Sequence, residues 1–303
     1  MGNRHRHTFL SMVLLLAGSL FCLPAVYAQD DDVIKVDASA VVVNASVTDA
    51  SGRAVDGLKQ LQFKVFEDGV EQKISSFSAE DTPFAAVILI DTSGSMEERV
   101  SLARSAAIEF LNGLRGDDYA EIYNFDSKVR QVQDFSNQRD LRDAIFDLRA
   151  NGTTVLNDAI YQAAADLSKR PEQRRAILVL SDGADTASKK NFDKALKAAL
   201  SINAMIYTVD MSPVDKPAAE RNDGVGALKS FAEKTGGRFI ATPGGPTMRN
   251  AFKTICEELG QQYTLTYEPA NTKKDGKWHA IEVRISRPNL TIRTRKGYNA
   301  PRQ

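Results

Sequence analysis

The chain has 303 residues, and its 39 lysines and arginines balance 39 aspartates and glutamates, so the formal net charge is zero. That balance argues against a protein that binds nucleic acid through an excess of basic surface. Hydrophobic residues make up 43% and charged residues 26% of the chain, which indicates a folded rather than a disordered protein. Three histidines and two cysteines are too few for most zinc sites, and they argue against histidine-dependent catalysis.

The first residues have the pattern of a secretory leader. Arg4 and Arg6 precede an apolar run over residues 9–23, and the small residue Ala28 follows. A basic start, a short apolar run and a small residue predict a signal peptide over residues 1–28. Because the run is too short to span a bilayer comfortably and no later stretch is apolar enough, we expect no membrane span after cleavage. The mature protein is then periplasmic or extracellular.

Two other interpretations of this segment stay open. One is an uncleaved membrane anchor, and the other is a lipoprotein attached through Cys22, although bulky Phe21 stands where a small residue is expected. Cleavage would leave Cys256 as the single cysteine, so an exported chain would depend on its core rather than on a disulfide. Cys256 lies on an apolar helical stripe and is most simply a small buried residue.

The middle of the chain alternates strand and helix patterns. Residues 85–90, 177–180 and 205–209 are continuously apolar, as expected of strands buried on both faces. Apolar residues recur at helical spacing between and after these runs, over residues 96–114, 156–167, 192–199 and 228–232. The alternation predicts an α/β domain over residues 84–260, a doubly wound, mainly parallel sheet covered by helices on both faces.

The two flanks have the alternating pattern of short β-strands. Asp68 and Gly69 separate two such runs and predict a hairpin in the first flank, residues 29–83. Neither this flank nor the second, residues 261–303, is expected to bury enough apolar surface alone. We therefore predict one small β-sandwich built from both flanks, with the α/β domain inserted into it. Two separate β-appendages packed on the α/β domain are the alternative.

Polar side chains follow the predicted strands where each of them ends. Asp91, Ser93 and Ser95 come after the first apolar strand, and Asp182 comes after the second. Residues 151–154 lead into the helical segment between them and end in two threonines. In a doubly wound sheet, ligands bind outside the carboxyl ends of the strands near the point where the strand order reverses. These loops are therefore predicted to converge on one point.

Every candidate ligand at this point is a hydroxyl or a carboxylate, and such hard oxygen ligands select Mg²⁺, Mn²⁺ or Ca²⁺. The alternation of Asp91, Ser93 and Ser95 suits a tight loop that presents every second side chain to one side. A site with few charges leaves its ion electrophilic. It would therefore favour an additional carboxylate from outside the chain.

These residues resemble the von Willebrand factor type A domain family, whose metal-ion-dependent adhesion site has the pattern D-x-S-x-S, then T, then D. The matching positions are Asp91, Ser93, Ser95, Thr154 and Asp182. Thr153 is the alternative to Thr154, which we favour because family members place the threonine four residues before an Asp-Ala-Ile-like sequence, here at Asp158. The resemblance covers residues 84–260.

The resemblance implies a Rossmann-like fold and a divalent ion, usually Mg²⁺, held by the serines and the threonine. It also implies a protein partner that carries an exposed Asp or Glu, as in cell adhesion. The chain is similar in arrangement to exported bacterial proteins that contain this domain, whose individual roles are mostly unassigned.

Each candidate also has a purely structural interpretation. Helix capping would explain one of the three residues Asp91, Ser93 and Ser95, a strand-end turn would explain Asp182, and capping would explain Thr154. Three further acids near strand ends or helix starts are expected to be capping or solvated residues: Asp158, Asp185 and Asp210. For Asp158, a role in supporting the threonine loop is the alternative. His279 is expected to be a packed or exposed polar residue rather than a ligand.

The leading functional hypothesis is therefore a metal-dependent protein-binding module of the cell envelope or exterior. One alternative is a structural or assembly protein of the cell envelope that the metal merely stabilises. The other is a metal-assisted phosphohydrolase, for which the α/β segment has no histidine base, no glycine-rich phosphate loop and no G-x-S-x-G sequence. We expect no enzymatic activity.

Overall fold

The computed structural model describes residues 40–79, 82–138, 143–212, 218–241, 245–271 and 274–302. They belong to one compact unit, Ile34–Gln303. The predicted signal peptide, residues 1–28, lies outside the described residues. None of the helices in the described ranges is both long and apolar enough to cross a membrane.

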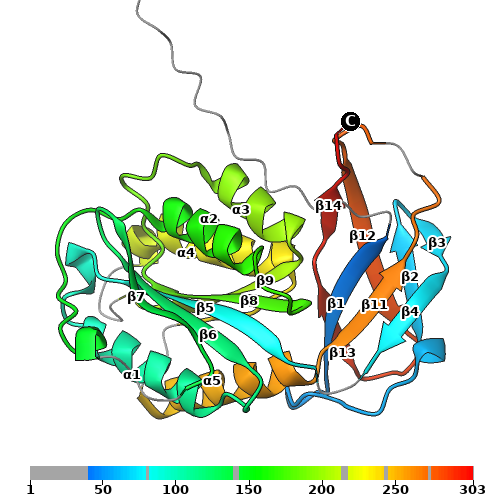
Figure 1. The fold of residues 1–303 in the computed structure, drawn as a ribbon, viewed down its shortest axis with the longest axis horizontal. Helices are drawn as coiled ribbons and strands as arrows, with labels where there is room; N and C mark the ends of the chain where they lie inside the picture. The colour runs from blue at the N-terminus through cyan, green and yellow to red at the C-terminus, as the bar shows by residue number, and fades with distance from the viewer. Residues whose placement is uncertain are drawn as a thin grey trace, which may run out of the picture. The chain divides into compact units, whose positions relative to one another are not determined.

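A six-stranded sheet forms the centre of the α/β part (Figure 1). Its strands are β5 (Phe84–Asp91), β6 (Tyr119–Phe125), β7 (Val129–Ser136), β8 (Arg174–Ser181), β9 (Ala204–Asp210) and β10 (Phe239–Ile240). The spatial order is β10-β9-β8-β5-β6-β7, and only β7 pairs antiparallel to its neighbour. The order reverses between β5 and β8, which places the switch point where the sequence predicted a ligand. The sequence analysis identified β5, β8 and β9 but not β6, β7 and β10.

Helices cover both faces of this sheet (Figure 1). Successive side chains of β5 point to opposite faces, so each face of the strand contributes to a different core. Ile88 and Ile90 pack in the core beneath α1 (Val100–Asn112) and α5 (Gly245–Gly260). Val87 and Leu89 pack in the core beneath three other helices. These helices are α2 (Leu156–Leu167), α3 (Phe192–Ser201) and α4 (Ala218–Thr235). The predicted doubly wound α/β fold is confirmed.

Two four-stranded sheets form a β-sandwich from the flanks. The first has the order β13 (Thr291–Thr294), β1 (Val41–Thr48), β11 (Tyr263–Tyr267), β4 (Ile74–Ser78). The second has the order β14 (Gly297–Asn299), β12 (Trp278–Ile285), β2 (Phe63–Glu67), β3 (Val70–Gln72). Apolar side chains of both sheets share one core. Each sheet contains strands from both flanks, so two separate appendages are the wrong interpretation; the exact domain boundaries stay predictions.

The predicted hairpin joins β2 to β3 through Asp68 and Gly69. Both residues have positive φ, 49° and 82°, as a tight two-residue hairpin turn requires. Because β2 also pairs antiparallel with β12, the turn lies beside the start of β12. This register brings Asp68 next to His279.

Candidate functional site

Asp91 ends β5 and lies at the centre of the predicted site. Its side chain is buried, with none of its surface exposed. One carboxylate oxygen accepts a hydrogen bond from the Ser93 amide at 2.8 Å, and the other accepts one from the Ser181 hydroxyl at 2.5 Å. Ser181 ends the adjacent strand β8, and its hydroxyl oxygen also accepts a hydrogen bond from the Gly183 amide at 2.9 Å. The Asp91 carboxylate is therefore fixed from both strands.

Ser93 and Ser95 present their hydroxyl groups to the same place. Their Oγ atoms lie 3.2 Å apart, with Ser93 buried and Ser95 exposed. Ser93 precedes the short 3-10 helix η2 (Gly94–Met96), yet within the described residues its side chain makes no capping hydrogen bond to that helix. Helix capping therefore does not account for Ser93, and its hydroxyl group remains available as a ligand.

The loop that ends in the two candidate threonines, residues 151–154, lies against the loop that follows β5. The Gly94 amide donates to the Gly152 carbonyl at 3.2 Å, and the Asn151 amide donates to the Thr92 carbonyl at 2.8 Å. These two backbone hydrogen bonds hold the loops side by side.

The two candidate threonines differ in burial. Thr154 is buried and Thr153 is exposed. The N-cap of α2 is Val155 rather than Thr154, so the capping interpretation does not account for Thr154 either. The Thr154 carbonyl accepts hydrogen bonds from the amides of Thr186 and Ala187, which follow the third loop of the site, the one directly after β8.

Asp182 lies on that third loop, directly after β8. It is half-buried, and its carboxylate accepts a hydrogen bond from the Ala184 amide at 3.2 Å. Burial raises the pKa of Asp91 to about 6, and the negative charge of Asp182 contributes to the rise. The structure thus joins Asp91, Ser93 and Ser95 directly and places Thr154 and Asp182 on the loops hydrogen-bonded to them.

Three nearby acids bind backbone amides, in keeping with their predicted structural roles. Asp185 accepts a hydrogen bond from the Asn157 amide at 2.7 Å in the first turn of α2, where a negative charge is favourable. Asp158 accepts hydrogen bonds from the amides of Lys189 and Lys190. Asp210 accepts one from the Ser212 amide at 2.9 Å.

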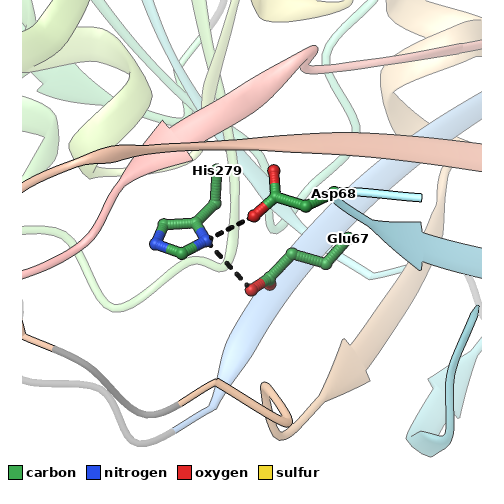
Figure 2. A group of neighbouring side chains, drawn as sticks. All are labelled: Glu67, Asp68 and His279. Carbon is green, nitrogen blue, oxygen red and sulfur yellow. Dashed lines mark hydrogen bonds and ion pairs between the residues drawn. The ribbon is translucent and has the colours of Figure 1, made fainter. Parts of the chain in front are cut away.

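A second group of potential metal ligands lies in the β-sandwich (Figure 2). His279 Nδ1 lies 2.8 Å from an Asp68 carboxylate oxygen and 3.3 Å from a Glu67 carboxylate oxygen. Glu67 and His279 are buried, and Asp68 is exposed. The three ligand atoms all lie within 4.8 Å of one another, so this group has the composition and the spacing to hold a metal ion. The sequence analysis treated His279 as a structural residue and did not single out Glu67.

A further buried carboxylate lies on β6. One oxygen of Glu121 accepts a hydrogen bond from the Gln131 side chain at 2.6 Å, and the other has no hydrogen-bond partner among the described residues. Burial raises the pKa of Glu121 to about 7.

Comparison with known proteins gives a match in the α/β part. Residues 86–184 match the von Willebrand factor type A domain family. This segment contains all five residues that the sequence analysis assigned to the metal site.

Solved structures resemble the chain at low identity. The PilB minor pilin from Streptococcus sanguinis is 15% identical, with a TM-score of 0.47, over 61% of this chain and 63% of the pilin. A von Willebrand factor type A protein from Catenulispora acidiphila is 12% identical, with a TM-score of 0.49, over 85% of this chain and 73% of that protein. The corresponding domain of the type V pili tip protein Mfa5 from Porphyromonas gingivalis is 14% identical, with a TM-score of 0.49, over 59% of this chain and 95% of that domain. The chain thus spans less than two thirds of the pilin, and these likenesses transfer no function to it.

Proposed function

We propose that the chain is a non-enzymatic binding protein that engages a protein partner through a divalent ion, held within the segment that matches the von Willebrand factor type A domain family. The ion is held where β5 and β8 end, and the partner completes its coordination with an exposed Asp or Glu. The proposal rests on the residues of this chain rather than on any relative.

The residues at the site fit a hard divalent ion, Mg²⁺ or otherwise Mn²⁺ or Ca²⁺. All of the donors are oxygens, which such ions prefer. Ser93, Ser95 and Thr154 would be direct ligands, and Asp91 and Asp182 would act directly or through water. When bound, the ion supplies an electrophilic centre that attracts an outside carboxylate.

One observation carries the proposal. The Ser93 and Ser95 hydroxyl oxygens lie 3.2 Å apart beside the buried Asp91 carboxylate, and Asp91 is itself fixed by two hydrogen bonds. Burial disfavours an unpaired negative charge at Asp91, and a cation beside it removes that penalty. Pre-positioned oxygens around a poorly compensated carboxylate are what a metal site requires.

The proposed location is outside the cytoplasm, in the periplasm or beyond the cell. It rests on the leader-like pattern of residues 1–28, in which a basic start precedes a short apolar run. Peptide sequencing of the secreted or periplasmic protein should find a new amino terminus after Ala28. Retention of residues 1–28 on a membrane-bound product would contradict this part of the proposal.

Binding is best tested with immobilised peptides that carry an exposed Asp or Glu, each paired with its Asn or Gln counterpart. We expect capture of the acidic peptides in Mg²⁺, loss of capture in chelator, and little capture of the amide peptides. Pull-downs from envelope extracts, with and without Mg²⁺, would then identify the physiological partner. Equal capture in Mg²⁺ and in chelator would contradict the proposal.

Matched variants separate metal binding from folding. Ser93→Ala and Ser95→Ala should abolish Mg²⁺-dependent capture, whereas Ser105→Ala, an exposed serine on α1, should leave it unchanged. Thr154→Ala should weaken Mg²⁺ binding and Thr153→Ala should not, because Thr154 is buried whereas Thr153 is exposed. A large Mg²⁺-dependent rise in melting temperature with unchanged capture in Ser93→Ala would instead favour a structural metal.

A further inference from the structure

In the β-sandwich, two carboxylates each have one oxygen anchored and the other directed at the same imidazole nitrogen. One oxygen of Glu67 accepts hydrogen bonds from the Tyr267 hydroxyl at 2.6 Å and the Tyr298 hydroxyl at 3.1 Å. One oxygen of Asp68 accepts a hydrogen bond from the Ala280 amide at 2.8 Å. The other oxygen of each carboxylate faces His279 Nδ1 (Figure 2). Such outer hydrogen bonds orient metal ligands in known metal sites.

The imidazole alone satisfies these carboxylates poorly. A single Nδ1–H group makes one good hydrogen bond, here to Asp68 at 2.8 Å, and leaves Glu67 at the longer distance of 3.3 Å. Nε2 of His279 is buried and has no partner among the described residues. The Nδ1–H group therefore satisfies the Asp68 oxygen better than the Glu67 oxygen.

The buried side chain of Arg295 interacts electrostatically with Glu67. Its guanidinium carbon lies 5.5 Å from the centre of the Tyr298 ring, whose hydroxyl group donates to Glu67. The same guanidinium donates hydrogen bonds to the carbonyl oxygens of Leu200 and Val42. A cation bound between Glu67 and Asp68 would add to this compensation of the two carboxylates.

Space for such an ion to exchange its ligands lies beside the carboxylates. A cavity of about 360 Å³ is lined by Glu67, Asp68, Val70, Gln72, Ala270 and Asn271. Two of these six residues are the carboxylates of the group. The cavity gives access from solvent and leaves room for water or for an outside ligand on an ion.

We propose that Glu67, Asp68 and His279 bind a divalent transition-metal ion, with Zn²⁺ as the best-fitting ion. One imidazole nitrogen and two carboxylate oxygens are ligands that Zn²⁺ accepts, and imidazole favours such ions over Mg²⁺. Three protein ligands, two of which line the cavity, would leave a coordination position open to water or to an anionic ligand. The ion would also tie the β2–β3 turn to β12, since its ligands come from both.

The test is calorimetric titration of the untagged chain with Zn²⁺ in the presence of saturating Mg²⁺. We expect one Zn²⁺ site in the wild type that is retained in Asp91→Ala, because the site lies outside the α/β domain. Affinity should fall at least tenfold in Asp68→Asn and in His279→Gln. Asn tolerates the positive φ of Asp68 and keeps an acceptor for the Ala280 amide, so the turn should persist.

Glu71→Gln is the matched control, because Glu71 is an exposed acid on β3 that pairs with Lys64 outside the group. It should bind Zn²⁺ as the wild type does. Nitrogen NMR of the imidazole gives a second readout, since Zn²⁺ should shift Nδ1 of His279 far more than Nε2. The proposal would be overturned if the wild type had no Zn²⁺ site, or if Asp68→Asn and His279→Gln bound Zn²⁺ with the affinity of the wild type. Loss of peptide capture in Asp91→Ala concerns only the other site.

Discussion

The ends of β5 and β8 and the edge of the β-sandwich offer metal ions two different chemistries. At the first, Ser93 and Ser95 contribute neutral hydroxyl groups from a loop, and Asp91 is the buried acid. At the second, Glu67 and His279 project from strands, and their ligand atoms are carboxylate and imidazole. Hard oxygen donors with few charges suit Mg²⁺ and leave it electrophilic, whereas imidazole with two carboxylates suits Zn²⁺ and neutralises it.

The two regions share one principle of construction. In each, residues outside the ligand set fix the ligands: the Ser181 hydroxyl holds Asp91, and the phenol groups of Tyr267 and Tyr298 hold Glu67. In each, a glycine with positive φ forms the adjacent turn, Gly183 in the first and Gly69 in the second. Comparable changes in the two regions therefore show how strongly each site depends on its supporting residues.

The largest expected effect comes from a matched pair of glycine substitutions. Gly183→Ala places a Cβ 2.2 Å from the Gly224 carbonyl oxygen at a φ of +83°, so both the backbone and the packing resist it. We expect it to lower the free energy of unfolding by about 4 kcal/mol. Gly69→Ala, at a φ of +82° with nothing within 4 Å, should cost about 1 kcal/mol. Urea unfolding measures both, and equal costs would contradict the close contact at Gly183.

Ser181→Ala removes the hydroxyl group that donates to Asp91 at 2.5 Å and accepts from the Gly183 amide. Loss of this support should weaken Mg²⁺ binding ten- to a hundredfold, the usual cost of removing an outer hydrogen bond from a metal site. Calorimetric titration with Mg²⁺ measures the change, and Zn²⁺ binding in the sandwich should stay as in the wild type. Unchanged Mg²⁺ affinity would mean that Ser181 only shapes the loop.

Tyr298→Phe is the counterpart in the β-sandwich. It removes one of the two phenol donors to Glu67 while keeping a ring stacked on His279 at 5.5 Å between centroids. Because the Tyr267 hydroxyl still donates to Glu67, we expect Zn²⁺ affinity to fall by about tenfold, the lower end of such effects. Mg²⁺ binding should be unaffected. A parallel loss of Mg²⁺ binding would show that the variant disturbs the whole chain.

The smallest expected effect comes from Glu121→Gln, which tests how burial of a carboxylate away from both proposed metal sites affects stability. Because the folded pKa of Glu121, about 7, lies above its ordinary value of 4.5, the folded state holds the extra proton between these values. The contribution of Glu121 to stability is therefore fully present below pH 4.5 and is lost as pH rises to about 7. Glu121→Gln should make the protein more stable above pH 7 by about 1 kcal/mol, since solvent screens part of the effect.

Urea unfolding at pH 5 and pH 8 measures this difference. Gln at position 121 keeps an acceptor for the Gln131 side chain, so the hydrogen bond itself should persist. Glu71→Gln, on the exposed strand β3, serves as the control. A gain in stability at pH 5 that equals the gain at pH 8 would contradict the role of the raised pKa.

The sequence predicted what local patterns encode. Continuous apolar runs identified β5, β8 and β9, and the polar residues after β5 and β8 follow from the same pattern. It did not identify β6, β7 and β10, whose residues had been left without an assignment. The supporting role of Ser181 also escaped it, because its hydrogen bond to Asp91 joins the ends of two strands that are adjacent only in the folded sheet.

The grouping of Glu67, Asp68 and His279 in the β-sandwich could not be predicted from local sequence patterns. Asp68 and His279 are 211 positions apart in the sequence, and only the pairing of β2 with β12 brings them together. Asp68 was identified as part of a turn, which is correct, but a turn pattern says nothing about the side chain that faces it. A single histidine in a β-strand carries no sequence signal for the two acids beside it.

The interleaving of the two flanks has a consequence for the order of events during synthesis. In the first sheet, Val43 of β1 pairs with Leu265 of β11, so β1, the first strand of the described residues, stays without either neighbour in its sheet until synthesis has passed the α/β domain and reached β11. The α/β domain, whose strands are all made in between, is then free to fold first and bring the two ends together. A truncation before β11 should consequently leave β1 with an unpaired edge, which invites aggregation of the nascent protein.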